Sequence, residues 1–147
     1  MLGIDLLILL AAYIGMEGVA WLAHKFIMHG PLWSWHKDHH QPRPGKHFQT
    51  NDLFFLVFAI PGFSCLAIGL EGLTWPFWVG LGITCYGLTY FLVHDLLIHR
   101  RTSWFGLPRT KYFQAVHRAH RAHHRNPHRQ KGHSFGMLLF PRKYWKS

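Results

Sequence analysis

Residues 4–29, IDLLILLAAYIGMEGVAWLAHKFIMH, combine an apolar run with a pair of histidines directly after it, and this combination decides the fold. The apolar part, residues 4–23, is about as long as a helix that crosses a lipid bilayer. It has no basic start and no small-residue cleavage site, so we expect a retained membrane anchor rather than a cleaved secretory leader.

Two further apolar runs follow. Residues 53–70, LFFLVFAIPGFSCLAIGL, form the second, and residues 75–93, WPFWVGLGITCYGLTYFLV, form the third, which is again followed by a histidine pair. Only the four residues EGLT separate these two runs, so we expect a tight helical hairpin. The sequence thus predicts an all-α integral membrane protein with three clear spans, in a single domain over residues 1–147.

The charges predict the topology. The chain has 16 Lys and Arg against 6 Asp and Glu, and every basic residue lies within 24–52 or 100–147. With three spans both regions lie on one side of the bilayer, and the positive-inside rule makes that side cytoplasmic. We therefore expect the N-terminus outside the inner (cytoplasmic) membrane. Because topology accounts for the basic excess, we do not expect nucleic-acid binding.

Histidine is the most over-represented residue, with 14 in 147. Most of the histidines follow one pattern, a pair with four residues between its members and then an H-x-x-H-H triplet, and the pattern occurs twice. The four motifs are HKFIMH (24–29), HKDHH (36–40), HDLLIH (94–99) and HRAHH (120–124).

The spacing predicts a site for two metal ions, formed by the histidine motifs within residues 24–40 and 94–124. Positions i, i+3 and i+4 share a helix face, so each triplet can direct three imidazoles at one point. Positions i and i+5 differ by about 140° on an ideal α-helix. Either the helix loosens where it leaves the membrane, or the two members of a pair serve different ions. Ten imidazoles are too many for one ion but suit two ions with open coordination positions.

The carboxylates narrow the choice of metal. With only Glu17 and Glu71, the chain cannot build a glutamate-rich di-iron site. Structural zinc sites are closed and four-coordinate, whereas an all-imidazole pair with open positions suits oxygen chemistry at iron. We expect Asp38, Asp52 and Asp95 to support the ligands. Glu17, one heptad before the first pair, is predicted to be an outer acceptor or a proton carrier; packing against the third span is the alternative.

Four histidines stay outside this assignment. His117 shares a helix face with the last triplet but has no assigned role. We expect His47, His128 and His133 to be surface residues.

The motifs resemble those of the eight-histidine integral membrane di-iron oxygenases, which include fatty-acid and sterol hydroxylases and desaturases. Within that superfamily the resemblance is closer to the bacterial β-carotene hydroxylases. It is carried by MHGPLWSWHKDHHQP, NDLFF, VHDLLIHRR, AHRAHH and SFGMLLFP. Members commonly have about four spans, so three to four transmembrane helices are expected. The resemblance implies ten iron ligands: His24, His29, His36, His39, His40, His94, His99, His120, His123 and His124.

The resemblance also implies the reaction. One oxygen atom from O2 would enter C3 of each β-ionone ring of β-carotene, with two electrons per step, to give β-cryptoxanthin and then zeaxanthin. The carotenoid would come from the bilayer, and a reduced ferredoxin-type donor would meet the basic face. Zinc can occupy the same imidazoles in purified protein. Trp33, Phe48 and Tyr90 are candidate pocket residues.

Two alternatives remain. One is a fatty-acid or sterol hydroxylase or desaturase of the same superfamily. The other, which we consider less favoured, is a non-catalytic membrane metal carrier. A transporter places its ionisable ligands near the bilayer midplane, whereas these histidines cluster at one membrane face.

Overall fold

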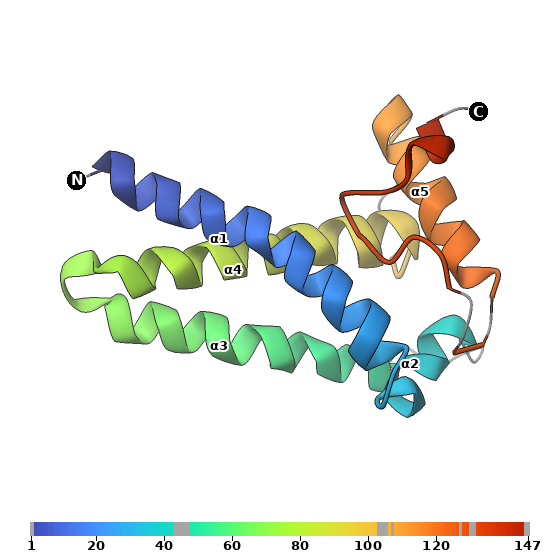
Figure 1. Ribbon diagram of the computed structural model, residues 1–147, viewed down its shortest axis with the longest axis horizontal. Coiled ribbons are helices and arrows are strands. Elements are labelled where there is room, and N and C mark those ends of the chain that lie inside the picture. The colour runs from blue at the N-terminus through green and yellow to red at the C-terminus, as the bar shows by residue number, and fades with distance from the viewer. Residues whose placement is uncertain are drawn as a thin grey trace.

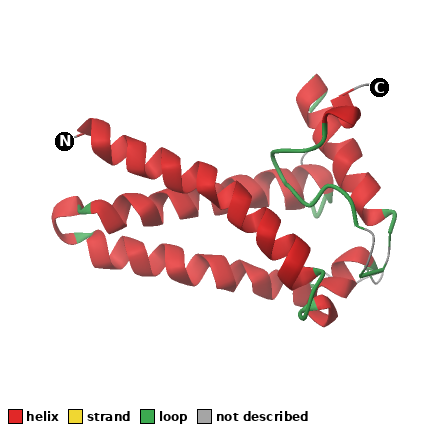
Figure 2. Ribbon diagram, viewed as in Figure 1, coloured by secondary structure: helices red, strands yellow, loops and turns green. Residues whose placement is uncertain are grey.

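The computed structural model describes residues 2–42, 48–102, 106, 108–126, 128–129 and 132–145. Within these residues every regular element is a helix, as Figure 2 shows. The three longest are α1 (Leu2–Leu22), α3 (Phe54–Gly69) and α4 (Trp75–Tyr90). Over the same described residues, three helical segments are long and apolar enough to cross a membrane: Gly3–Met28, Thr50–Gly69 and Trp75–Ile98. The all-helical membrane fold predicted from the sequence is confirmed.

The helix α4 packs against both α1 and α3. Glycines on α4 allow this close approach. A Cβ atom at Gly82 would lie 2.5 Å from the carbonyl oxygen of Leu9 in α1, and one at Gly80 would lie 2.6 Å from that of Gly62 in α3. Small residues at such contacts bring transmembrane helices together without a loss of van der Waals contact.

The predicted hairpin joins α3 to α4. Its turn contains a short 3-10 helix, Glu71–Leu73, in which Gly72 adopts a φ of 75°. That left-handed conformation strains most other residues, so glycine suits the position. Figure 1 shows the turn at the same end of the bundle as the N-terminus.

The outer surface of the bundle is apolar. Large side chains such as Ile14 (68% exposed), Ile60 (62%) and Ile68 (72%) point away from the protein on the spans. A continuous apolar surface of this kind is not tolerated in water but suits contact with lipid tails. The chain is therefore a membrane protein.

The opposite end of the bundle carries the polar elements. There the short helix α2 (Trp33–His40) and the helix α5 (Lys111–His124) lie beyond the spans, as Figure 1 shows. Residues 132–145, here called the tail, return past α5 toward the bundle. Hydrogen bonds join the tail to α5: Tyr112 Oη donates to the Leu138 carbonyl (2.9 Å), and the Arg118 guanidinium donates to that of Tyr144 through Nε (3.1 Å) and Nη2 (2.8 Å).

Candidate metal centre

Both histidine pairs lie where a membrane helix widens into a π-helix. The first π-helix is Ala23–Met28 and the second is Phe91–Ile98. The His29 N–H donates to the His24 carbonyl (3.0 Å), and the His99 N–H donates to the His94 carbonyl (2.9 Å). This i to i+5 bonding brings together positions that an α-helix would separate. Of the two explanations for the pair spacing, loosening of the helix is therefore confirmed.

The histidines form two buried groups. In each group one ring nitrogen per residue lies within 4.8 Å of the corresponding atoms of the others, so each can hold a metal ion. The first histidine group is His24, His29, His36, His40 and His123. The second histidine group is His39, His99, His120 and His124.

The expectation that each triplet converges on one point is wrong. His36 and His40 belong to the first group, whereas His39, between them in sequence, belongs to the second. In the other triplet, likewise, His123 leaves its neighbours and joins the first group. The reason is angular: at 100° per residue, positions i and i+4 differ by about 40°, whereas adjacent positions differ by about 100°. The middle histidine of each triplet thus belongs to the group whose other members come from the other half of the chain. His39 joins the second group, and His123 joins the first.

His94 lies beside the second group but is not one of its four members. Its ring centroid lies 4.6 Å from that of His99 and 4.8 Å from those of His39 and His120. The residue is buried (2% exposed), and its Nδ1 lies 3.5 Å from a carboxylate oxygen of Asp95. Nine of the ten predicted ligands are therefore gathered into the two groups, and the tenth packs against one of them.

The hydrogen bonds of the first group fix which ring nitrogen faces inward. Nδ1 of each of four rings lies 3.0–3.2 Å from a backbone carbonyl oxygen. Because a carbonyl only accepts, Nδ1 carries the hydrogen and a neutral ring keeps a lone pair on Nε2. The four pairs are His24 with Phe135, His29 with Arg129, His40 with Asn126 and His123 with His133.

The inward nitrogens of the first group lie at separations that suit ligands of one metal ion. Nε2 of His24 lies 3.1 Å from Nε2 of His36, and Nε2 of His123 lies 3.1 Å from that of His40. Facing lone pairs repel, but two ligand atoms at right angles, each about 2.1 Å from one ion, are separated by about 3.0 Å. The donor set therefore fits a metal ion that prefers imidazole.

The second group shows the same features with fewer outer partners. Nε2 of His99 lies 2.8 Å from Nε2 of His120. His39 Nδ1 lies 3.1 Å from the side-chain oxygen of Gln49. Nε2 of His124 is buried with no hydrogen-bond partner among the described residues. An unsatisfied buried nitrogen is costly, and a metal ion would satisfy it.

Burial keeps these rings uncharged. It lowers the pKa of His40 to about 4 and the pKa of His123 to about 2. Burial likewise lowers the pKa of His124 to about 2, and the nearby His99 lowers it further, because neighbouring imidazolium cations repel. The groups are therefore neutral near pH 7, which is the form of imidazole that binds metal ions.

The three predicted aspartates support the site indirectly. Asp38 accepts hydrogen bonds from the backbone N–H groups of Thr50 and Asn51, and Asn51 Oδ1 in turn lies 2.6 Å from Nδ1 of His36. Asp52 and Asp95 both bind Arg101, at 2.6 and 2.9 Å. The carboxylates thus position the residues that hold the histidines, and Asp95 itself lies 3.5 Å from Nδ1 of His94.

Arg101 is the centre of this network, and the sequence reading did not single it out. Its guanidinium binds both oxygens of Asp52 and also Gln49 Oε1 (3.2 Å), the atom that faces His39. The signal for it was the pair of arginines directly after HDLLIH in VHDLLIHRR. Gln49, Asn51 and the backbone carbonyls that face the first group were also missed.

Replacing Arg101 with Ala should weaken metal binding by the second group. Gln49 and Asp95 would lose their common partner, and loss of such an outer partner typically costs about 10–100-fold in metal affinity. Arg101→Lys should not restore the affinity, because an ammonium cannot bind two oxygens side by side. Titration of the metal-free protein with Fe²⁺ measures the effect. Lys37→Ala, which removes an exposed cation next to His36, is the control; an Arg101→Ala variant that titrates like it would contradict the assignment.

Aromatic residues surround the histidines. The rings of Trp33 and His29 have centroids 5.1 Å apart, and those of Tyr90 and His94 are 4.7 Å apart. Both candidates therefore lie at the site, whereas Phe48 is 81% exposed. Phe135 was not predicted; its ring lies 5.2 Å from those of His29 and His123.

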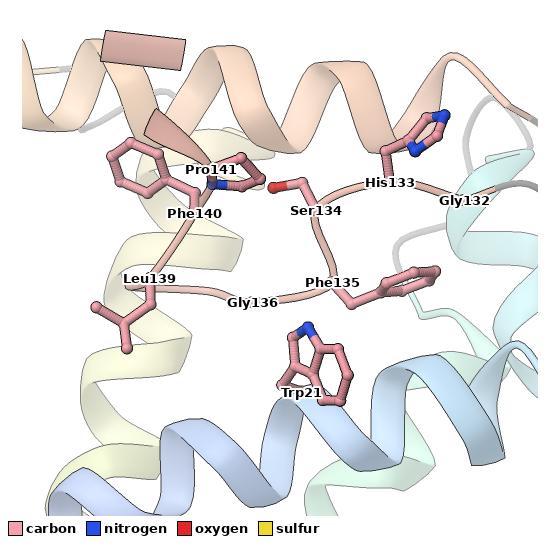
Figure 3. Close-up of a pocket in the computed structure, with 9 residues that line it drawn as sticks. All are labelled: Trp21, Gly132, His133, Ser134, Phe135, Gly136, Leu139, Phe140 and Pro141. Atoms are coloured by element: carbon pink, nitrogen blue, oxygen red, sulfur yellow. The ribbon is translucent and has the colours of Figure 1, made fainter. Parts of the chain in front are cut away.

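Behind Phe135 lies an apolar groove, shown in Figure 3. Trp21 of α1 forms one wall, and tail residues form the other. Phe135 lines this groove and also contacts the first group, with its ring centroid 5.5 Å from that of His24. The tail residues that line the groove are Gly132, His133, Ser134, Phe135, Gly136, Leu139, Phe140 and Pro141.

Of the four remaining histidines, the three that the structure describes lie outside both groups. His117 lies on α5 but belongs to neither group of the described residues. The side chains of His128 and His133 are exposed, as expected, although the backbone carbonyl of His133 holds His123. His47 lies outside the described residues.

Comparison with known proteins agrees with this geometry. Residues 9–141 match the fatty acid hydroxylase family. A β-carotene hydroxylase of Pseudescherichia vulneris is 45% identical over 92% of this chain and 76% of its own length, and one of Pantoea ananas is 46% identical over 92% and 77%. A β-carotene 3-hydroxylase of Arabidopsis thaliana is 38% identical over 90% of this chain and 44% of its own length. No solved structure matches. The chain therefore belongs to the fatty acid hydroxylase family, among relatives named β-carotene hydroxylases.

Proposed function

We propose that this chain is a β-carotene hydroxylase that acts at C3 of the β-ionone rings with two iron ions, O2 and two electrons per hydroxylation. The observation that carries the proposal is the convergence of neutral histidine nitrogens in two adjacent buried groups. The relatives support the substrate, since proteins of both bacteria and plants that match most of this chain are named for it.

The ten histidines, His24, His29, His36, His39, His40, His94, His99, His120, His123 and His124, would hold the two ions. When bound, iron would supply the activation of O2, so that one oxygen atom enters the ring C–H bond and the other leaves as water with two electrons and two protons. The donor set is consistent with this role, because imidazole ligands suit iron. Zinc would fill the same positions in protein purified without iron.

The chain's own residues orient the histidine rings and shield the site from water. Backbone carbonyls and the amides of Gln49 and Asn51 hold the far ring nitrogens, so the near nitrogens stay directed inward. The rings of Trp33, Tyr90 and Phe135 cover the groups with apolar surface. That cover would exclude water from the reacting carbon. With the apolar spans in the bilayer, the site would lie at the membrane boundary, where a carotenoid would approach from the bilayer.

We propose that the histidine end faces the cytoplasm, in keeping with the positive-inside rule. α5, at this end, carries exposed basic residues, Lys111 and Arg121 among them. A positive surface attracts a negatively charged partner, so a reduced donor of the acidic ferredoxin type is the expected source of electrons.

Expression in cells that accumulate β-carotene tests the function. We expect conversion to β-cryptoxanthin and zeaxanthin, measured by chromatography of the pigments. His128→Ala, which changes an exposed histidine outside both groups, should convert as the unchanged protein does. Unaltered β-carotene in cells that contain the iron-loaded protein would contradict the carotenoid assignment and return attention to fatty-acid or sterol substrates.

A further inference from the structure

Glu17 is a buried carboxylate on α1, within the first span, and the reaction described above does not use it. Its side chain is 7% exposed. Oε1 accepts three hydrogen bonds, each 2.9 Å long, from the consecutive backbone N–H groups of Met137, Leu138 and Leu139. Oε2 accepts a fourth, 2.7 Å long, from Tyr86 Oη on α4. Successive N–H groups around one oxygen form a nest for an anion, so the carboxylate fixes this turn of the tail.

This bonding confirms the predicted contact of Glu17 with the third span and adds a partner that the sequence did not indicate. Its partners are the tail and Tyr86, and no histidine ring of the described residues donates to it. The carboxylate does pack toward the third span, through Tyr86, but its main partner lies 120 residues further along the chain. Only the folded structure brings the two together.

The anchored turn adjoins the residues that hold the first histidine group. The carbonyl of Phe135 faces His24 Nδ1 at 3.0 Å, and that of His133 faces His123 Nδ1 at 3.0 Å. Gly136, the residue between Phe135 and the anchored N–H groups, makes the close turn possible. A Cβ atom there would lie 2.2 Å from the Leu139 carbonyl oxygen and 3.1 Å from Glu17 Oε1.

In the described part of the chain, the hydrogen bonds that tail carbonyls accept from histidine rings come from the first group. Its carbonyls orient His24 and His123, both members of the first group. The second group relies instead on the segment around Gln49, through His39. Movement of the tail would therefore disturb the rings of the first group and leave the second in place.

We propose that Glu17 is a positioning residue for the first histidine group: it seats the tail so that two tail carbonyls fix the ring orientation of His24 and His123. This inference rests on the proposed two-metal centre. In this role the carboxylate affects the binding of one metal ion indirectly, through the tail, and does not carry protons.

The test compares metal content in full-length protein purified in detergent and loaded with ⁵⁷Fe²⁺ without oxygen. Glu17→Leu removes the acceptor while keeping an apolar side chain in the span. We expect the affinity for one of the two ions to fall by about 10–100-fold. At limiting iron the Mössbauer spectrum should then lose one of two components. Cleavage of the tail by trypsin at Arg142 should become faster.

Two variants separate positioning from a general loss of structure. Glu17→Gln keeps an oxygen that can accept from the three tail N–H groups, so this variant should bind both ions. Tyr86→Phe removes only the bond to Oε2 and should keep both. Gly136→Ala disturbs the same turn from the tail side and should reproduce the selective loss seen in Glu17→Leu.

The outcomes are distinct. Retention of both ions, with an unchanged spectrum, in Glu17→Leu and Gly136→Ala would overturn the inference. Equal loss of both ions in these variants, with helix content retained, would overturn it too, because the effect would not be confined to the first group. If the unchanged protein binds no iron, the proposed function itself fails, and that result is visible before any variant is measured.

Discussion

His123→Ala abolishes hydroxylation and releases metal from the first histidine group; this is the largest effect that we expect from any single substitution. His123 is 0% exposed, and its Nε2 lies 3.2 Å from Nε2 of His29 and 3.1 Å from that of His40. Removal of the imidazole takes away one inward nitrogen and leaves a cavity among the other histidine rings. The affinity for iron should fall by more than about 100-fold, beyond the effect of losing an outer partner.

Iron content and pigment conversion, measured on the same preparations, check this expectation. His128→Ala serves as the matched control, since it removes an exposed histidine that follows the same helix. Full conversion by His123→Ala would show that the ligand set is wrong.

The second large effect concerns the exchange of histidines between the two halves. His39 and His40 are adjacent in sequence but belong to different groups. His39→Ala combined with His120→Ala should therefore remove one ion and leave the other, because both residues lie in the second group. His39→Ala combined with His40→Ala should weaken both ions, because the two changes fall in different groups.

Stoichiometry and Mössbauer spectra of the two double variants distinguish these cases. The exchange would be contradicted if the adjacent pair, His39 and His40, affected one ion and left the other at full occupancy. Such a result would restore the simpler view that each H-x-x-H-H triplet serves a single metal ion.

The parts of the structure that follow from local sequence were predictable. The three spans were predictable because a long apolar run in a bilayer must satisfy its own backbone hydrogen bonds, and a helix does so. The helix that widens at each pair was one of two explanations for the spacing of His24 and His29, and of His94 and His99. The histidine motifs were recognisable because few other functions use ten imidazoles in this pattern.

The division of the triplets was missed because spacing gives the angles on one helix and not the position of its partner. His36 and His39 lie on the same short helix, α2, but they belong to different groups, and His124 of α5 packs against His39. The same limit applies to Arg101, whose partners Asp52 and Asp95 lie on two different segments.

The outer partners of the first group were unpredictable for another reason. Most are backbone carbonyls, which every residue possesses, so no side-chain motif marks Phe135 or His133 as the acceptor. Glu17 was noticed as an unusual carboxylate in a span. Its role depends on a contact with Met137 that requires the complete fold.

Iron K-edge X-ray absorption on the loaded protein tests the central proposal, a pair of iron ions held by imidazoles, most directly. The account predicts about two iron atoms per chain. Each should have nitrogen or oxygen neighbours at roughly 2.0–2.2 Å and the outer-shell scattering of several imidazole rings. A spectrum dominated by sulfur, or by oxygen with no imidazole signature, would contradict it.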